Sequence, residues 1–374
     1  MFPLLKRVYF GPALNSKVYQ KTARIPRKFV FKLHEGTDLP QLSSIIDLSL
    51  FLNISVNELL GYAYTQDPDN KKYYIKSRSI NKKKNKWKEY NSSHYRRYLI
   101  PKANGSSRMI AAPKYRLKLI QRRILAEILQ KAELPEMCTG FRKGMSIVDN
   151  AKPHLNANTV IKMDLKEFFP SLKFIHVFQV FQGFGYSRPI AGLLSCLCTD
   201  IYRKERYAPQ GAPTSPMIAN LYAKNFDARM HGFWSKKGFK FTRYADDLTI
   251  SSQKQIKGID YMIKHSLKII TDENLMPNTE KTKIYRKGNK KKITGIVVSD
   301  QMNPDRAWCM KLRAQIHQFK INKQTLTKEE LRSEKNEIQG KIAFLQMINP
   351  NKAEKYRQLA KDCLNYSENP LELN

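Results

Sequence analysis

The sequence has few cysteines and no long apolar run. Its 374 residues include five cysteines, none in a Cys-x-x-Cys pair, which argues against a disulfide framework and a structural zinc site. The longest apolar stretch, residues 190–198, is broken by Gly192 and Ser195 and is far shorter than the ~20 residues that span a bilayer. Lys6 and Arg7 lie inside the apolar stretch at the amino terminus, which is wrong for a secretory signal. We therefore expect a soluble, cytoplasmic protein with no membrane partner.

Acidic residues are also scarce. The chain has 32 Asp and Glu against 67 Lys and Arg, a formal net charge of +35, while its 41% hydrophobic residues supply a core. The excess is spread, with 30 basic and 11 acidic residues in 1–160 and 24 and 12 in 161–300. This spread favours a long basic surface that contacts a polyanion, with nucleic acid as the natural partner. A basic face kept for solubility is the alternative, and charge alone does not separate an enzyme from a passive binder.

The periodicity of the first half predicts helices and one hairpin. Residues 40–62 have apolar residues at helical spacing, which predicts short helices closed by Gly61. The lysine-rich residues 65–95 predict a connector or an RNA-facing loop. Residues 98–110 predict a hairpin around an Asn-Gly turn. The apolar face of a basic helix over 114–131 consists of Leu117, Ile120, Ile124 and Ile128.

The second half predicts strands alternating with helices, so the fold class is α+β. Ser215 precedes a proline and is the predicted N-cap of a helix. Thr327 and Glu330 have the spacing of a capping box. The other predicted elements are a strand over 161–164, helices over 174–198, a strand–turn–strand over 239–251 and a strand over 293–298.

Three carboxylates lie beside apolar strands in this otherwise basic chain. Asp164 closes one strand, and Asp246 and Asp247 occupy the turn of a hairpin. Adjacent carboxylates repel each other unless a cation lies between them, and Mg²⁺ is a hard cation that carboxylates and phosphates bind. If Asp164 lies across from the hairpin, the three could hold two Mg²⁺ ions for nucleotidyl transfer. An Asp-Asp pair also occurs in ordinary turns, so this feature alone leaves both interpretations open.

Three motifs in order resemble those of the reverse transcriptases. Asp164 begins Asp-Leu-Lys-Glu-Phe-Phe, residues 209–216 read Pro-Gln-Gly-Ala-Pro-Thr-Ser-Pro, and residues 244–247 read Tyr-Ala-Asp-Asp. The resemblance implies an RNA-directed DNA polymerase with a right-hand architecture of fingers, palm and thumb, an antiparallel palm sheet and a helical N-terminal extension. The domains it implies are an N-terminal extension and connector over 1–85, fingers over 86–160, a palm over 161–300 and a helical thumb over 301–374.

The resemblance also implies roles for individual residues. Asp164, Asp246 and Asp247 are the implied catalytic and metal-binding residues, with two Mg²⁺ ions as cofactor and Mn²⁺ as the substitute. The implied nucleotide-binding residues are Lys102 and Arg108 on the triphosphate, Phe169 as the steric gate against ribonucleotides, and Gln210 and Gly211 in the nucleotide pocket.

Two further motifs resemble those of bacterial retron reverse transcriptases. Asn150 and His154 form an Asn-Ala-x-x-His pattern, and Thr294 and Gly295 follow Ile293 where retron enzymes have Val-Thr-Gly. These four residues are the predicted RNA-binding residues. The resemblance implies a structured non-coding RNA as partner, priming from a guanosine 2′-hydroxyl, dNTP substrates, an RNA–DNA hybrid and a covalently linked single-stranded DNA. It also implies phage defence with a separate effector protein.

Two alternatives remain open from the sequence. The chain could belong to another bacterial reverse transcriptase class, such as a group II intron-like or other defence-associated one. It could also be a non-catalytic scaffold that binds RNA, although the complete set of carboxylates argues against this.

Overall fold

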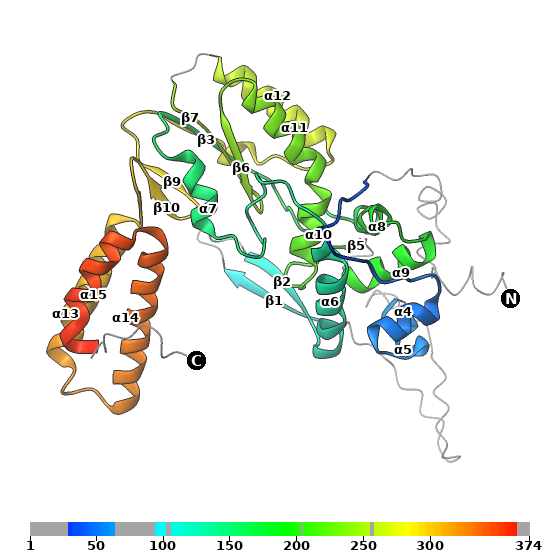
Figure 1. Cartoon of the computed structure of the whole chain (residues 1–374), viewed down its shortest axis with the longest axis horizontal. Coiled ribbons are helices and arrows are strands. Elements are labelled where there is room, and N and C mark those ends of the chain that lie inside the picture. Colours follow the sequence, from blue (N-terminus) through cyan, green and yellow to red (C-terminus); the bar gives the residue numbers. More distant parts are fainter. Residues whose placement is uncertain are drawn as a thin grey trace. The chain divides into compact units, whose positions relative to one another are not determined.

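The computed structural model describes residues 29–63, 94–101, 105, 107–202, 205–254 and 258–364 (Figure 1). Most of the predicted connector over 65–95 and the predicted triphosphate ligand Lys102 lie outside these ranges. The chain divides into two compact units. The first comprises 1–135, 166–226 and 270–276, and the second comprises 136–165, 227–269 and 277–374.

The first two helices among the described residues of the first unit are the short α4 (Ile45–Leu52) and α5 (Val56–Ala63). A capping box starts α4, because the Ser44 hydroxyl accepts from Asp47 N and the Asp47 carboxylate accepts from Ser44 N. Asn53 in the left-handed conformation ends it. The prediction of short helices over 40–62 is therefore confirmed, except that Gly61 does not close α5, which continues to Ala63.

A hairpin and a basic helix follow. Strands β1 (Tyr95–Pro101) and β2 (Ser107–Pro113) pair antiparallel, as predicted, with Pro101 opposite Ser107. The next helix, α6 (Tyr115–Glu127), buries the apolar face predicted for it. The short helix η1 (Leu129–Lys131) continues it. The remaining elements of this unit are α8 (Phe174–Gly183), α9 (Arg188–Cys198), β4 (Asp200–Tyr202), β5 (Glu205–Tyr207) and α10 (Ser215–Tyr222).

Helix α10 starts one residue earlier than the sequence predicted. Thr214 is its N-cap and Ser215 its first residue, so the proline lies at the second helical position instead of the first. The shift is local, and Ile218 and Tyr222 on this helix are both buried.

The second unit is built on a four-stranded antiparallel sheet in the order β6-β7-β3-β8. Its central strand β3 (Thr159–Asp164) pairs with β7 (Asp247–Ser252) on one side and β8 (Lys283–Tyr285) on the other. Strand β6 (Lys240–Tyr244) pairs with β7 through a two-residue loop. Helices α11 (Lys224–Ser235) and α12 (Ile259–Asp272) lie beside the sheet (Figure 1).

Short segments complete the sheet region. Helices α7 (Ile147–Ala151) and η2 (Lys152–His154) precede β3, and η3 (Thr279–Lys281) precedes β8. Strands β9 (Lys291–Ile293), β10 (Ile296–Val298) and β11 (Met302–Asn303) form a separate three-stranded sheet. The prediction of one strand over 293–298 is wrong. Thr294 and Gly295 both have positive φ and form a tight turn between β9 and β10.

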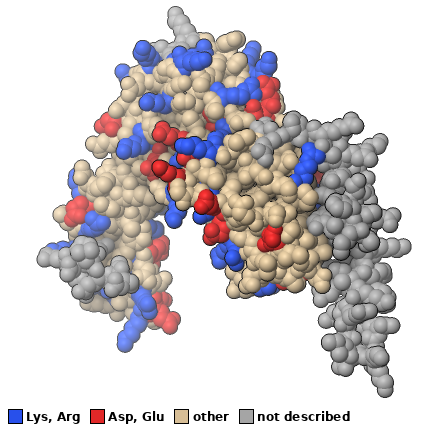
Figure 2. Space-filling view, turned by 45° about the vertical axis from the view of Figure 1, so that its right-hand side comes forward, with Lys and Arg blue, Asp and Glu red and all other residues tan. Residues whose placement is uncertain are grey.

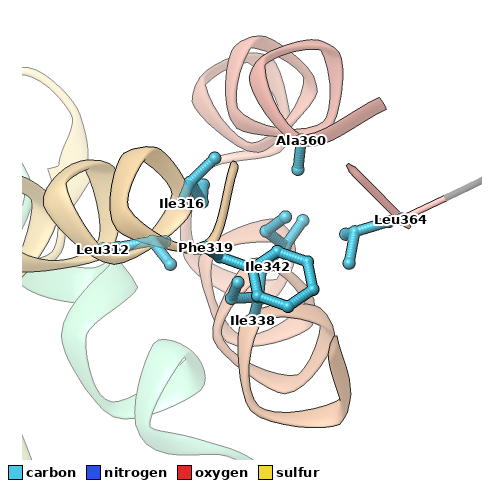
Figure 3. Close-up of a cluster of buried hydrophobic side chains, with 7 residues drawn as sticks. All are labelled: Leu312, Ile316, Phe319, Ile338, Ile342, Ala360 and Leu364. Atoms are coloured by element: carbon cyan, nitrogen blue, oxygen red, sulfur yellow. The ribbon is translucent and has the colours of Figure 1, made fainter. Parts of the chain in front are cut away.

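Three helices end the described chain. They are α13 (Arg306–Asn322), α14 (Lys328–Ile348) and α15 (Pro350–Leu364). The predicted capping box of Thr327 and Glu330 is confirmed at the start of α14. Figure 3 shows side chains from all three helices meeting in one cluster, which consists of Leu312, Ile316, Phe319, Ile338, Ile342, Ala360 and Leu364.

The structure and the order of its elements confirm the predicted α+β class with an antiparallel sheet and a helical N-terminal extension. The boundaries of the four predicted domains remain a prediction. Among the described residues, no single helix is long and apolar enough to cross a membrane, and only the bent pair α4 and α5 meets that test jointly.

Candidate active site

The three predicted catalytic carboxylates lie at one end of the four-stranded sheet. Asp164 is the last residue of β3 and lies directly opposite Asp247, the first residue of β7. Because directly opposed residues of antiparallel strands point to the same face, these two side chains share a face. Asp246 is in the loop just before Asp247, and its carbonyl accepts from Leu165 N at 3.0 Å. The structure therefore brings all three residues to the same corner of the sheet.

Asp164 is held by a segment that precedes β8. Its backbone carbonyl accepts from Asn278 N at 2.8 Å. Its Oδ2 accepts from Asn278 Nδ2 and from Lys281 Nζ, each at 2.9 Å. This carboxylate is nearly buried, whereas the lysine side chain is 61% exposed. A mostly exposed lysine thus pairs with a nearly buried carboxylate.

The charged groups at this corner of the sheet shift one another's pKa values. Burial raises the pKa of Asp246, and the nearby carboxylates of Asp164 and Asp247 raise it further. Burial also raises the pKa of Asp247, which Lys162 partly offsets. Hydrogen bonding to Asp164 raises the pKa of Lys281. The site therefore accumulates negative charge that a cation would stabilise.

The donor set fits a hard divalent cation. Carboxylate oxygens are the ligands that Mg²⁺ prefers. Burial, and after it the charge of neighbouring carboxylates, raises the pKa of Asp246 and of Asp247. Within the described residues, no group of three or more His, Cys, Asp or Glu side chains already has metal-ligating geometry. Lys281 and Asn278 occupy Oδ2 of Asp164 in this arrangement.

A fully buried ion pair supports the loop that carries Asp246. Arg243 on β6 binds Asp227 of α11 through two hydrogen bonds of 2.6 Å, and neither side chain is exposed. The same guanidinium donates to Ala245 O in the loop at 3.1 Å. Ala245 has a φ of 57°, a left-handed conformation that costs a non-glycine residue roughly 1–2 kcal/mol. Arg243 thus stabilises a strained loop beside the carboxylates.

The close approach of another segment also fixes this loop. A Cβ at Gly140 would lie 2.6 Å from Ala245 N, so only glycine fits there. Thr139 N donates to Arg243 O, and Arg243 N donates to Met137 O, so this segment covers the outer edge of β6.

Several predicted nucleotide-binding residues lie in the first unit. Gln210 O accepts from Ala111 N on β2 at 2.8 Å, and a Cβ at Gly211 would clash with the Ile110 side chain. The loop of Gln210 and Gly211 therefore packs against the strand that carries Arg108.

The predicted gate residue also lies in the first unit, after Asp164 in the chain. Phe168 is 3% exposed, whereas Phe169 is only partly buried. The two neighbouring rings therefore differ in exposure, with Phe168 in the core and Phe169 reaching the surface.

A family model described as "Reverse transcriptase (RNA-dependent DNA polymerase)" matches residues 100–341. The chain belongs to the reverse transcriptase family. Members of this family are RNA-dependent DNA polymerases, which bind an RNA template and use divalent metal ions.

Several similar curated proteins are retron enzymes, which confirms the predicted resemblance. The Retron Ec86 reverse transcriptase of Escherichia coli is 32% identical over 89% of this chain and 93% of the relative. The Retron Mx65 reverse transcriptase of Myxococcus xanthus is 33% identical over 72% of this chain, and the Retron Mx162 enzyme of the same organism is 30% identical over 84%. This chain spans only 64% and 66% of those two relatives.

Similarity to solved structures is weaker. A telomerase from Candida albicans in complex with a fragment of telomeric RNA is 13% identical over 72% of this chain and 63% of that chain, with a TM-score of 0.45.

Two predicted RNA-binding residues lie in the core of this reverse transcriptase. Asn150 and His154 are both 0% exposed, so neither side chain can contact RNA directly, and we correct the prediction for these two. Asn150 hydrogen-bonds Thr139 and Thr294, whereas His154 contacts Ser251 and Thr242. Both side chains therefore connect neighbouring segments inside the core through hydrogen bonds.

The other two predicted RNA-binding residues form the turn between β9 and β10. Thr294 is partly buried, and its hydroxyl donates to Ile147 O at 3.1 Å. Gly295 is exposed, and a Cβ there would meet no described atom within 4 Å. The turn is therefore accessible at Gly295 and anchored at Thr294.

His154 should make the stability of the protein pH-dependent. Burial lowers its pKa from 6.5 to about 3, and its ring nitrogens lie 2.6 Å from Ser251 Oγ and 2.8 Å from Thr242 Oγ1. Because the folded pKa lies below the unfolded pKa, this contribution is complete above pH 6.5 and is lost as the pH falls towards 3. At pH 5 the loss amounts to about 2 kcal/mol.

The matched variant is His154→Gln, whose amide can bridge the same two hydroxyls but does not titrate. Urea unfolding at pH 7 and pH 5 should show a smaller fall in unfolding free energy for this variant than for the wild type. An equal fall in both proteins would contradict the assignment.

The sequence did not single out Lys281, Asn278, Asp227 or Arg243. Asn278 and Lys281 lie three residues apart just before a strand, so both lie near its start. Because many lysines surround them in the sequence, nothing distinguishes Lys281 from its neighbours. Arg243 adjoins the Tyr-Ala-Asp-Asp motif, and a basic residue beside two carboxylates is the one local signal for its role.

Proposed function

We propose that this chain copies RNA into DNA at the corner formed by Asp164, Asp246 and Asp247. The observation that carries the proposal is the register that sets Asp164 opposite Asp247, with Asp246 in the adjoining loop. Membership of the reverse transcriptase family supports it. The substrates are dNTPs and the template is RNA, with an RNA–DNA hybrid as the product.

Asp164, Asp246 and Asp247 would hold two Mg²⁺ ions, for which Mn²⁺ could substitute. The ions supply activation of the primer hydroxyl and stabilisation of the charge on the leaving pyrophosphate. The protein would contribute carboxylate oxygens at a position where like charges already repel one another. Lys281, whose side chain is mostly exposed, would have to leave Oδ2 of Asp164 for that oxygen to hold an ion.

Nucleotide selection lies with the residues of the first unit. We propose that Lys102 and Arg108 bind the triphosphate, and that the backbone of Gln210 and Gly211 forms part of the nucleotide pocket. Phe169 faces the sugar, since Phe168 is committed to the core. An aromatic ring at that place offers a ribose 2′-hydroxyl no hydrogen-bond partner, which disfavours ribonucleotides.

The biological substrate that we propose is a structured non-coding RNA of the retron type. Priming from a guanosine 2′-hydroxyl in that RNA would leave a single-stranded DNA covalently linked to it. The support is the similarity to relatives named retron reverse transcriptases, one of which aligns over nearly its full length. By the same resemblance we propose that the enzyme acts in the bacterial cytoplasm, in phage defence with a separate effector protein.

The test combines an activity assay with the nucleic acid that copurifies. Purified protein should extend oligo(dT) on poly(rA) with dTTP, and chelation of divalent ions with EDTA should abolish extension. Sequencing of copurified nucleic acid should find one structured RNA joined to DNA through a ribonuclease-sensitive link. Inactivity with both Mg²⁺ and Mn²⁺ would favour a non-catalytic scaffold, and a guide-like RNA without linked DNA would favour another reverse transcriptase class.

A further inference from the structure

The turn between β9 and β10 contains a residue in an unfavourable conformation. Thr294 has a φ of 43° and Gly295 a φ of 90°. Glycine adopts positive φ readily, but a β-branched residue in the left-handed region is an outlier that persists only when neighbouring groups enforce it. Something other than the local sequence therefore holds Thr294 in place.

Two hydrogen bonds hold Thr294 in the structure. Its hydroxyl donates to Ile147 O at 3.1 Å and accepts from Asn150 Nδ2 at 3.4 Å. Both partners belong to α7, which lies next to β10 and to β6 (Figure 1). A fully buried helix residue therefore fixes the anchored side of an otherwise exposed turn.

The same asparagine also connects to the strand that leads to the catalytic loop. Thr139 Oγ1 lies 2.8 Å from Asn150 Oδ1 and 3.1 Å from Arg243 O. Side-chain contacts thus run from β6 through Thr139 and Asn150 to Thr294. Every group in this path lies within the second unit.

We propose that Asn150 is a positioning residue that keeps Thr294 and Gly295 in the conformation that binds the nucleic-acid strand. The inference rests on the proposed function, because the strand is the primer–template of DNA synthesis. The open space around Gly295 leaves room for a phosphate backbone, and lysines occupy β9 immediately before the turn. Asn150 itself touches no nucleic acid.

The expected effect on KM follows from the fraction of molecules in which the turn keeps the binding conformation. If loss of Asn150 lets the turn relax so that about one tenth of the molecules keep the binding conformation, apparent affinity falls about tenfold. For Asn150→Ala we therefore expect KM for poly(rA)·oligo(dT) to rise about tenfold, while kcat changes less than about twofold. Thr294→Val removes only the hydroxyl and should raise KM in the same direction.

A second substitution provides the decisive rescue. Asparagine tolerates positive φ, and Asn-Gly is the preferred pair for a tight hairpin turn of this kind. Thr294→Asn in the Asn150→Ala background should therefore return KM to within about threefold of wild type without restoring the lost bond. A residue that served only to stabilise the fold would not be rescued in this way.

The control is Thr325→Val, because Thr325 also donates its hydroxyl to a carbonyl in a turn, at Asn322 O, away from this path. Its KM should match wild type. The proposal is wrong if folded Asn150→Ala keeps the wild-type KM, or if Thr294→Asn fails to lower a raised KM. Should Asn150→Ala not fold, an unchanged KM in Thr294→Val overturns the proposal equally. Wild-type inactivity on this substrate would instead refute the proposed function.

Discussion

Asp246→Asn is expected to abolish DNA synthesis. In the absence of metal ions, the same substitution is expected to raise the melting temperature of the protein. The substitution removes one of three carboxylates that we propose bind the catalytic ions, and a loss of about 10³-fold or more corresponds to about 4 kcal/mol of transition-state stabilisation. RNA binding should change little, because we expect basic side chains elsewhere on the surface to provide the charge contacts. Figure 2 shows Lys and Arg side chains on several separate parts of the described surface.

The stability effect has the opposite sign for a physical reason. Burial and two neighbouring carboxylates raise the pKa of Asp246, so its ionised form destabilises the folded protein at neutral pH. This cost disappears as the pH falls below the ordinary pKa of the group. In EDTA at pH 7 the melting temperature of Asp246→Asn should exceed that of wild type, and the difference should vanish near pH 3.

Asp38→Asn removes the same charge from an exposed position and serves as the control. It should leave both extension and melting temperature unchanged. Loss of RNA binding by Asp246→Asn comparable to its loss of synthesis would mean that the hairpin is structural and would refute a metal-binding role.

The second large effect is expected when the buried pair of Asp227 and Arg243 is broken. Both side chains are 0% exposed, and burial raises the pKa of Asp227 while Arg243 opposes the shift. Removing one partner leaves an uncompensated buried charge, so Asp227→Ala should cost about 3–5 kcal/mol of unfolding free energy. Urea unfolding measures this loss.

Replacing both partners separates stability from positioning. A double variant, Asp227→Leu with Arg243→Met, fills the space with apolar groups and should recover most of the stability. It still lacks the guanidinium that donates to Ala245 O, so the loop that carries Asp246 loses its support. Primer extension should therefore stay about 100-fold below wild type, since small displacements of catalytic groups cost rates of that order.

The control for the ion pair is Glu354→Ala, which breaks an exposed pair with Arg357 and should change the unfolding free energy by less than about 1 kcal/mol. Recovery of both stability and full activity by the double variant would show that Arg243 serves the fold alone.

The sequence by itself determined the elements whose cause is local. The capping box of Thr327 and Glu330 and the apolar face of α6 were predictable because neighbours along the chain create them. The strand–turn–strand around Asp246 was predictable because alternating apolar residues and a tight turn are both local patterns. The catalytic carboxylates could be proposed because three motifs in order are far more specific than any one.

The tertiary structure decided which side chains meet across long sequence separations. Lys281 reaches Asp164 over 117 residues, and Asn150 reaches Thr294 over 144. No local pattern encodes such contacts, because they depend on how the strands pair and which faces become buried. Asn150 and His154 were predicted to contact RNA, but both are buried and hydrogen-bond other segments inside the core. Polar residues are expected at the surface when only their type is known. The packed fold shows which of them are instead buried with their hydrogen bonds made inside the protein.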